Sequence, residues 1–379
     1  MLNKLYWPLN KPFDLMKIAI LHTRLAPYFV ACLRELASQG HELRVFAQPQ
    51  DEDAPFDRSQ FDGIGDVQDR SVLSENDILA ELQSFQPDAV LVAGWSDRVY
   101  MKVCRTLRKQ GIPVIAGCDT QWKGSLRQYL ASWTAPLHIH QTIDVLWVSG
   151  ERQRVFSQAL GYTGNRCWDG FYACDWVRFA TANRSSKVES RRSEKRAFLF
   201  VGRYVDVKGI DTLAEAYQQY CEKVDHPWRL VCAGAGPLKQ TLLDAGAEDR
   251  GFVQPTDLPQ LMEESSAFVL PSRFEPWGVV VQEAAASSLP LICSDACGAG
   301  VHLLRDHYNG YSFPAGDITA LTDRMVQMTN LAQASYMAFA GHSFDLSKQY
   351  TPERWVQILV SGIDRCFDTL DQKKYEIFR

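Results

Sequence analysis

The chain has 379 residues, of which 46% are hydrophobic and 22% charged, and its formal net charge is −5. This length exceeds what one hydrophobic core usually serves, so two domains are expected. The acidic balance gives no electrostatic reason to expect a nucleic-acid partner. No segment reaches the ~18 uninterrupted apolar residues of a membrane-spanning helix. The ten cysteines have no zinc-type spacing, which predicts a reduced, cytoplasmic protein without a metal centre.

The first fifteen residues include Trp7 and Lys11 but have no apolar core and no small-residue cleavage site of a signal peptide. We interpret them as an extension that lies on the first domain. Aromatic and basic residues also suit a membrane interface, so peripheral membrane contact stays open as an alternative.

Strand and helix patterns alternate from residue 16 onward. The predicted strands of the first half cover residues 17–22, 42–47, 88–93, 113–118 and 144–148. An amphipathic helix is predicted over residues 27–38, and helix-compatible sequence follows the other strands. Because strands that alternate with helices form parallel sheets, the first half is predicted to be an α/β unit.

A polar, aperiodic segment, residues 181–196, interrupts this pattern. Its basic run would suit nucleic acid, but a solvated linker between domains is the preferred interpretation. The α/β pattern then returns. Strands are predicted over 197–201, 229–233, 251–254, 267–270 and 291–294, and helices over 210–223, 238–244, 319–331 and 352–370.

The predicted fold is therefore two Rossmann-like, doubly wound α/β domains that face a central cleft. Residues 1–180 form the first domain, residues 181–196 the linker and residues 197–354 the second domain. A C-terminal helix over about residues 355–379 can pack back onto the first domain.

Two glutamates flank the junction between a predicted strand and the next helix. Glu275 lies on the loop after residues 267–270, and Glu283 lies about one and a half turns into the helix that begins after Gly278. Ligands bind at this edge of open α/β sheets, and a helix N-terminus attracts phosphate. The pair suits a hydroxyl-rich ligand that carries phosphate. Acidic residues placed there only to complement the helix dipole are the alternative.

Two cations, Arg203 and Lys208, follow the strand that ends near Gly202. An arginine fork and a lysine charge can stabilise a diphosphate leaving group, although such residues also occur on ordinary surface turns. Gly234 and Gly236 would let the backbone approach a ligand. The third glycine of the dinucleotide fingerprint is missing from this turn, so an NAD oxidoreductase is not predicted.

The order of these motifs resembles the retaining family 4 glycosyltransferases of the GT-B fold. Gly202-Arg203 with Lys208-Gly209 resembles their phosphate-binding motif, and Gly234-x-Gly236-Pro237 their second-strand turn. Glu275 and Glu283 have the spacing of their E-x7-E signature, and residues 309–317 resemble the loop that follows. The resemblance is strong over about residues 195–330 and covers the first domain only in outline.

The resemblance implies a role for each charged residue. Glu275 would hold hydroxyls of the donor sugar, Glu283 would hold the ribose, and Arg203 with Lys208 would neutralise the diphosphate. It also implies transfer with retention from a nucleotide diphosphate sugar to a glycan or lipid-linked acceptor.

Backbone groups would complete the donor site. The resemblance places the amides of Gly278 and Val279 near the phosphates, with the Gly202, Gly234 and Gly236 turns, and the base near Val253. It implies that neither a metal nor another cofactor is required.

The first domain departs from the family at two places. The family's Gly-Gly loop is replaced by residues 23–26, where Arg24 could supply a cation or the loop could serve the acceptor. The family's active-site histidine is not evident, and Asp119 is our candidate for the polar group that faces the reacting sugar. Trp95 and Trp122 end strands nearby, where they could stack on sugars or pack in the core.

Three other interpretations fit parts of the sequence. Asp51-Glu52-Asp53 resembles a metal-binding D-x-D, but it lies in the wrong half of the chain and is interpreted as a solvated loop. A nucleotide-sugar epimerase on the same scaffold would need an added acid/base set. A non-catalytic nucleotide-binding subunit would explain the missing glycines and histidine.

Overall fold

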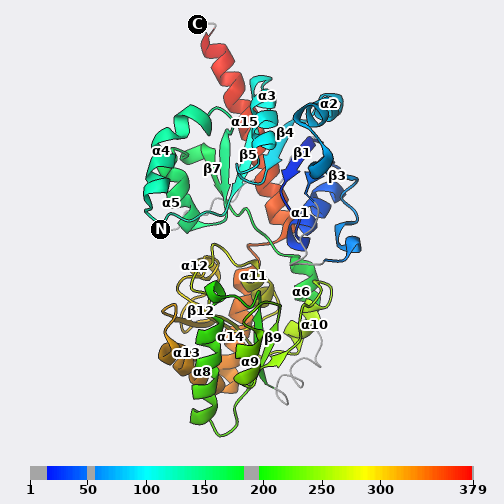
Figure 1. Cartoon of the computed structure of the whole chain (residues 1–379). Coiled ribbons are helices and arrows are strands. Elements are labelled where there is room, and N and C mark those ends of the chain that lie inside the picture. Colours follow the sequence, from blue (N-terminus) through cyan, green and yellow to red (C-terminus); the bar gives the residue numbers. More distant parts are fainter. Residues whose placement is uncertain (1–14, 49–55, 183–195, 378–379) are drawn as a thin grey trace.

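In this computed structural model the chain forms two α/β domains, one above the other (Figure 1). The structure describes residues 15–48, 56–182 and 196–377, with only the backbone of Arg58 and of residues 367–377. The Asp51-Glu52-Asp53 motif, the first fourteen residues and most of the predicted linker lie outside the described residues.

The N-terminal domain contains a seven-stranded parallel sheet in the order β3-β2-β1-β4-β5-β6-β7. Its strands are β1 Lys17–His22, β2 Glu42–Ala47, β3 Val67–Asp69, β4 Ala89–Val92, β5 Val114–Cys118, β6 Val145–Val148 and β7 Cys167–Asp169. Its helices are α1 Pro27–Ser38, α2 Glu75–Phe85, α3 Arg98–Lys109, α4 Leu126–His138 and α5 Glu151–Ala159, with 3₁₀ turns η1 Arg58–Phe61, η2 Arg70–Val72 and η3 Gly164–Arg166. The five predicted strands are confirmed. The sequence missed β3 and β7, which at three residues each are too short to show a period.

Both faces of this sheet are covered. Ile18 and Ile20 of β1 pack with α1, whereas Ala19 and Leu21 belong to a separate core with α2 and α3. A strand buried on both faces loses the alternation of apolar and polar residues, which is why Lys17–His22 is a nearly continuous apolar run.

The C-terminal domain contains a six-stranded parallel sheet in the order β10-β9-β8-β11-β12-β13. Its strands are β8 Ala197–Val201, β9 Arg229–Ala233, β10 Glu248–Asp249, β11 Ala267–Leu270, β12 Leu291–Ser294 and β13 Gly310–Phe313. Its helices are α8 Ile210–Lys223, α9 Lys239–Asp244, α10 Leu258–Glu263, α11 Val279–Ala286, α12 Gly300–Leu303, α13 Ile318–Thr329 and α14 Gln333–Ser347, with the 3₁₀ turn η4 Asp206–Lys208. The two parallel-sheet domains confirm the predicted fold class.

One predicted strand of this domain is wrong. Residues 251–254 are not in the sheet, and the paired strand is Glu248–Asp249, whose residues align with Val231 and Cys232 of β9. The apolar side chain of Phe252 instead contacts Phe56 of the other domain, with ring centroids 5.9 Å apart. The apolar residues Phe252 and Val253 suggested a strand, but Phe252 makes a contact between domains instead.

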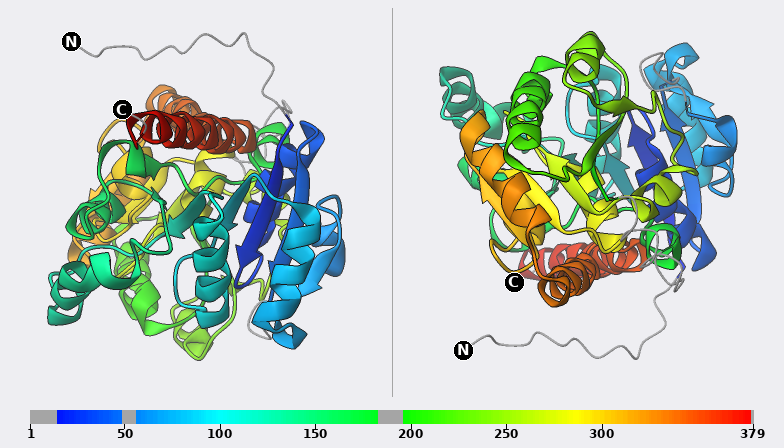
Figure 2. Two further views of the ribbon diagram at one scale, coloured as in Figure 1. Left: turned by 90° about the horizontal axis from the view of Figure 1, so that it is seen from above. Right: turned by 90° about the horizontal axis from the view of Figure 1, so that it is seen from below.

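The chain crosses between the domains twice. The helix α6, Trp176–Ala182, packs on α10 and α11, so residues 181–182 of the predicted linker are helical. The last helix, α15 Pro352–Ile377, packs on α1, and Trp355 and Leu359 lie in the core of the N-terminal domain. Both views of Figure 2 show α15 along one side of the molecule. Among the described helices none is both long and apolar enough to cross a bilayer.

Candidate active site

The loops that follow β8 and β11 contact each other at the carboxyl edge of the C-terminal sheet. The amide of Arg273 donates to the carbonyl oxygen of Val207 over 2.9 Å. Gly209 has a φ of +68°, and a Cβ there would lie 2.2 Å from the carbonyl oxygen of Pro271. Only glycine permits both the backbone conformation and the close approach. The two loops that carry the predicted site residues therefore form one packed unit.

Lys208 and Glu275 meet where these loops join. The Nζ of Lys208 forms an ion pair with Oε2 of Glu275, and the two side chains are only 18% and 10% exposed. The hydroxyl of Ser272 donates to the same carboxylate oxygen over 3.5 Å. Separating the partners of a buried ion pair leaves an uncompensated charge, which is costly. The pair therefore holds the two loops in one relative position. Two residues predicted from different motifs thus form one contact.

Arg273 braces the same loops and was missed by the sequence analysis. Its guanidinium donates to Oδ1 of Asp206 over 2.7 Å and to Oδ2 of Asp211 over 2.5 Å. The ion pairs join the β11 loop to η4 and to the first turn of α8. The signal available in the sequence was a charged residue directly after the strand and two positions before Glu275.

The glycines of the β8 and β9 loops serve contact between backbones. A Cβ on Gly234 would lie 1.9 Å from the carbonyl oxygen of Gly202, and a Cβ on Gly236 would lie 2.5 Å from that of Tyr204. The amide of Gly202 also donates to Ala233 over 3.0 Å. These close approaches explain the glycines without a ligand, and their part in donor binding stays a prediction.

Arg203 and Arg24 are both exposed, on the β8 loop and on the loop after β1. Within the described part of the chain the guanidinium of Arg203 makes no hydrogen bond or ion pair. The side chain is therefore available to an anionic ligand, while Lys208 is already paired.

Glu283 lies on α11 in a different environment from Glu275. Burial and, to a smaller extent, the nearby carboxylate of Asp175 raise the pKa of its carboxyl to about 8, although Arg178 opposes the rise. Asp175 and Arg178 belong to α6 and the segment before it, which cover α11. Gly278, which precedes α11, has a φ of +95° and a Cβ there would lie 3.1 Å from Cγ of Glu275. Gly278 therefore lies in the turn between Glu275 and the helix that carries Glu283, with a backbone conformation that other residues rarely adopt.

The N-terminal domain holds the Glu275 loop through two glutamines that the sequence analysis missed. The Nε2 of Gln121 donates to the carbonyl oxygens of Glu275 over 3.1 Å and Pro276 over 3.0 Å. The Nε2 of Gln153, on α5, donates to Pro276 over 2.5 Å and to the carbonyl oxygen of Asp119 over 3.2 Å. Both amides are buried. These bonds join the carboxyl edges of the two sheets at the candidate site.

Asp119 lies in this junction, directly after β5. Its side chain is exposed, and Oδ2 accepts a hydrogen bond from the hydroxyl of Tyr172 over 3.3 Å. The backbone oxygen of Tyr172 accepts one from Nε2 of Gln282 on α11 over 3.1 Å. The structure thus places Asp119 near the predicted donor domain, although its predicted chemical role is untested.

A second contact between the domains surrounds Trp277. Its ring lies 5.4 Å from that of His302, and the Nε2 of His302 accepts a hydrogen bond from the amide of Glu151 over 3.2 Å. Burial lowers the pKa of His302, which favours the neutral ring that this acceptor role needs. A Cβ on Gly150 would lie 2.5 Å from Trp277. The glycine at the start of α5 therefore allows the two domains to touch.

The predicted base region around Val253 also faces the other domain. The side-chain oxygen of Gln254 accepts a hydrogen bond from the amide of Asp57 over 3.4 Å, beside the contact of Phe56 with Phe252. Val253 itself is partly buried.

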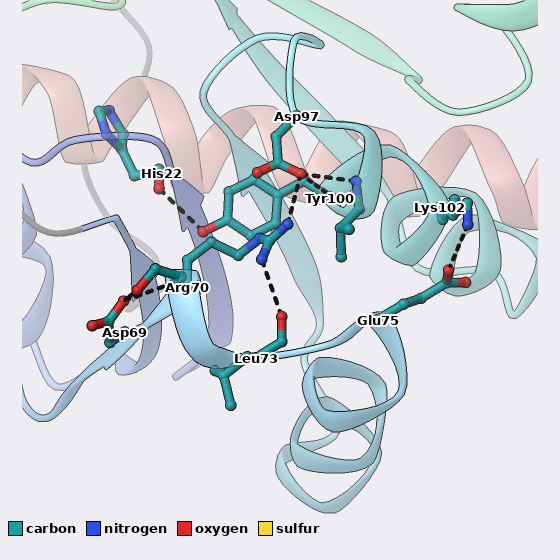
Figure 3. Close-up of polar contacts among 10 residues, drawn as sticks. His22, Asp69, Arg70, Leu73, Glu75, Asp97, Tyr100 and Lys102 are labelled. Atoms are coloured by element: carbon teal, nitrogen blue, oxygen red, sulfur yellow. Dashed lines mark hydrogen bonds and ion pairs between the residues drawn. The ribbon is translucent and has the colours of Figure 1, made fainter.

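A polar network fixes the carboxyl edge of the N-terminal sheet (Figure 3). Arg70 pairs with Asp97 over 3.3 Å and donates to the carbonyl oxygen of Leu73 over 3.0 Å. Asp97 caps α3 by accepting from the amides of Val99 and Tyr100. Since these groups bond one another, we interpret the network as structural. The predicted aromatic residues Trp95 and Trp122 both contact Phe156, with ring centroids 6.4 and 6.0 Å apart.

Across the described ranges, no group of three or more His, Cys, Asp or Glu residues is arranged to hold a metal ion. The prediction that no metal is required remains a prediction.

Residues 182–337 match the family model described as glycosyl transferases group 1. A protein of Methanocaldococcus jannaschii named as an uncharacterized glycosyltransferase is 30% identical over 157 residues, which are 39% of this chain and 39% of that protein. A GDP-mannose-dependent alpha-mannosyltransferase of Mycobacterium tuberculosis is 28% identical over 250 residues, or 63% of this chain and 64% of that one. The chain thus matches about two fifths of the first relative's length.

Solved structures show the same fold. A glycosyltransferase from Rickettsia africae superposes with a TM-score of 0.74 at 11% identity, covering 94% of this chain and 99% of that one. HepE from Anabaena, solved in complex with UDP, superposes with a TM-score of 0.70 at 16% identity, covering 94% of this chain and all of that one. The chain therefore has the GT-B fold.

Proposed function

We propose that this protein is a glycosyltransferase of the group 1 type that uses a nucleotide diphosphate sugar and transfers the sugar with retention. The observation that carries the proposal is the contact of Lys208 with Glu275 inside the segment that matches the family model. The ammonium of Lys208 and the carboxylate of Glu275, to which we assign the sugar hydroxyls, lie side by side at the sheet edge where α/β folds bind ligands. Arg203, whose side chain is exposed, follows the neighbouring strand β8.

In the proposed reaction the bond between the anomeric carbon and the diphosphate oxygen breaks, and a bond from the acceptor oxygen to that carbon forms on the same face. The acceptor's proton passes to the departing diphosphate. Lys208 and Arg203 would stabilise the negative charge that builds on the diphosphate, and Glu275 would orient the sugar. No metal is needed for these roles.

The donor side of the proposal follows the predicted site. Glu283 would bind the ribose, with the amides of Gly278 and Val279 near the phosphates and the base near Val253. The acceptor, a glycan or a lipid-linked sugar, would be bound by the N-terminal domain, where Asp119 and Arg24 lie. The side chains of Gln121 and Gln153 would hold the two domains in a fixed relative position during transfer.

The test begins with nucleotide binding. A ligand that binds only the folded state raises stability by about 2.7 kcal/mol at a hundred times its Kd. We expect UDP, GDP or ADP to raise the Tm of the wild type. Lys208→Ala should weaken this effect and lower kcat/KM about a hundredfold to a thousandfold, because one charge-stabilising group is lost.

Lys223→Ala is the matched control, since Lys223 lies in the same domain but pairs with Asp323 at the surface. Unchanged turnover in a folded Lys208→Ala protein would refute the assignment. Formation of a new nucleotide sugar from donor alone would indicate an epimerase. Nucleotide binding without hydrolysis or transfer would indicate a non-catalytic subunit.

A further inference from the structure

The helix α4 presents its apolar side chains to solvent rather than to the protein. Leu126, Leu130, Trp133 and Leu137 are 89%, 60%, 82% and 72% exposed. Their spacing places them on one face of the helix, and Tyr129, 57% exposed, lies beside them. We call these five residues the α4 stripe. The one buried residue of the helix, Ala135, lies on the opposite face.

This orientation is the reverse of the usual one. A surface helix normally turns its apolar face to the core and its polar face to water. Single exposed apolar residues are common, but five on one helix face form a continuous patch, and such patches mark interaction sites. Figure 1 shows α4 at the outer edge of the N-terminal domain, where no other described element covers it. The described residues therefore leave this face open to a partner.

The charge of the segment around α4 favours one kind of partner over another. Residues 120–143 contain Lys123, Arg127 and two histidines but no aspartate or glutamate, although the whole chain has a net charge of −5. Arg127 and His138, both exposed, border the stripe on one side of the helix. A second copy of the chain that paired through this face would set cations against cations with no acid to offset them. An anionic surface meets no such repulsion.

The composition of the stripe agrees with a bilayer surface. Tryptophan and tyrosine occur at the level of lipid headgroups, and leucines enter the boundary with the acyl chains. The helix is 13 residues long, which suffices to lie on a membrane but not to span it. We propose that α4 docks the protein on an anionic lipid bilayer, with the α4 stripe inserted and Arg127 at the headgroups.

The start of α4 is hydrogen-bonded to the segment that contacts the candidate site. The side chain of Gln128 accepts from the amide of Lys123 and donates to the carbonyl oxygen of Gln121, each over 2.7 Å. Gln121 in turn donates to the carbonyl oxygen of Glu275. The ammonium of Lys123 lies 3.6 Å from the ring centroid of Phe274. Docking would therefore bring the bilayer surface within a few residues of the site, where a lipid-linked acceptor could enter.

The experiment measures co-sedimentation of the full chain with vesicles, in the absence of any sugar donor. Vesicles of phosphatidylcholine alone are compared with an equal mixture of phosphatidylcholine and phosphatidylglycerol. We expect binding to the mixed vesicles, weakened by salt. The double variant Leu130→Ser/Trp133→Ser should bind about a hundredfold more weakly, at about tenfold for each buried side chain lost.

The matched control is Leu243→Ser/Met337→Ser, which removes two exposed apolar side chains from the C-terminal domain and should bind like the wild type. Equal loss in both variants, no vesicle binding by the wild type, or equal binding to neutral vesicles would each overturn the proposal. A concentration-dependent dimer that the α4 variant abolishes, without vesicle binding, would assign the stripe to a second copy. Because vesicle binding is measured without donor, its failure is separate from a failure of nucleotide binding or transfer.

Discussion

The pKa of Glu283 gives a pH dependence that can be measured without any substrate. Its carboxyl has a pKa raised from 4.5 to about 8, first by burial and then by Asp175. Between these two pH values the folded protein keeps the proton and the unfolded chain releases it. The unfolded state then binds fewer protons, so the free energy of unfolding falls as the pH rises. The stabilisation that this proton provides is fully present below pH 4.5 and is lost by about pH 8.

The size of the effect follows from the two pKa values. The full difference corresponds to at most about 5 kcal/mol, because one pKa unit is about 1.4 kcal/mol. Glu283 keeps part of its surface in contact with water, and Arg178 stabilises its charged form. We therefore expect about half of that value, 2–3 kcal/mol, which corresponds to about 5 °C in Tm for a domain of this size.

Glu283→Gln removes the titration and keeps the shape of the side chain. The difference in Tm between this variant and the wild type should grow in favour of the variant from pH 5 to pH 8.5. Differential scanning fluorimetry across that range measures it, with Glu215→Gln, at an exposed position of α8, as the control. A difference that stays constant with pH would refute the reasoning.

Two further predictions concern the N-terminal domain. Gly150→Ala should lower Tm by the equivalent of about 1–3 kcal/mol, because its Cβ would lie 2.5 Å from Trp277, whereas Gly341→Ala, with open space around its Cβ, should not. A Gly150→Ala protein as stable as the wild type would show that the domain contact adjusts freely. His22 has a pKa lowered from 6.5 to about 4 by burial, opposed by a hydrogen bond to the backbone of Arg24, so its neutral form stabilises the protein above pH 6.5 and this is lost as pH falls. His22→Phe should therefore gain Tm over the wild type from pH 6.5 to pH 5, and an equal acid dependence in both proteins would contradict this.

Local patterns in the sequence were enough to predict the strands that carry the site. Ala197–Val201 and Ala267–Leu270 are short apolar runs bounded by loop residues, and such runs form buried parallel strands. Once the strands are known to be parallel, Lys208 and Glu275 must both follow carboxyl ends of a sheet. The order of strands was not available from either run alone, because β8 and β11 are neighbours in the sheet but far apart in the chain.

The contacts between domains were beyond the sequence. Gln153 lies in a helix whose amide side chain could equally have faced water, and only its burial against the carbonyl oxygen of Pro276 shows what it does. A contact between domains also explains the strand wrongly predicted over residues 251–254. The apolar side chain of Phe252 packs on Phe56 of the other domain and not within a sheet. A contact across a domain interface does not produce a periodic pattern of apolar residues in either segment, so the sequence pattern does not reveal it.

The sequence by itself determined two parallel α/β domains and the loops that bear Arg203, Lys208, Glu275 and Glu283, because strand period, loop residues and motif spacing are local properties. The tertiary structure decided that Lys208 pairs with Glu275 and that the α4 stripe faces outward. The apolar spacing of residues 126–137 is the same for a helix packed in a core and for one that lies on another surface. Which of the two it is depends on whether the rest of the chain supplies a face to cover it, and the described part of this chain does not.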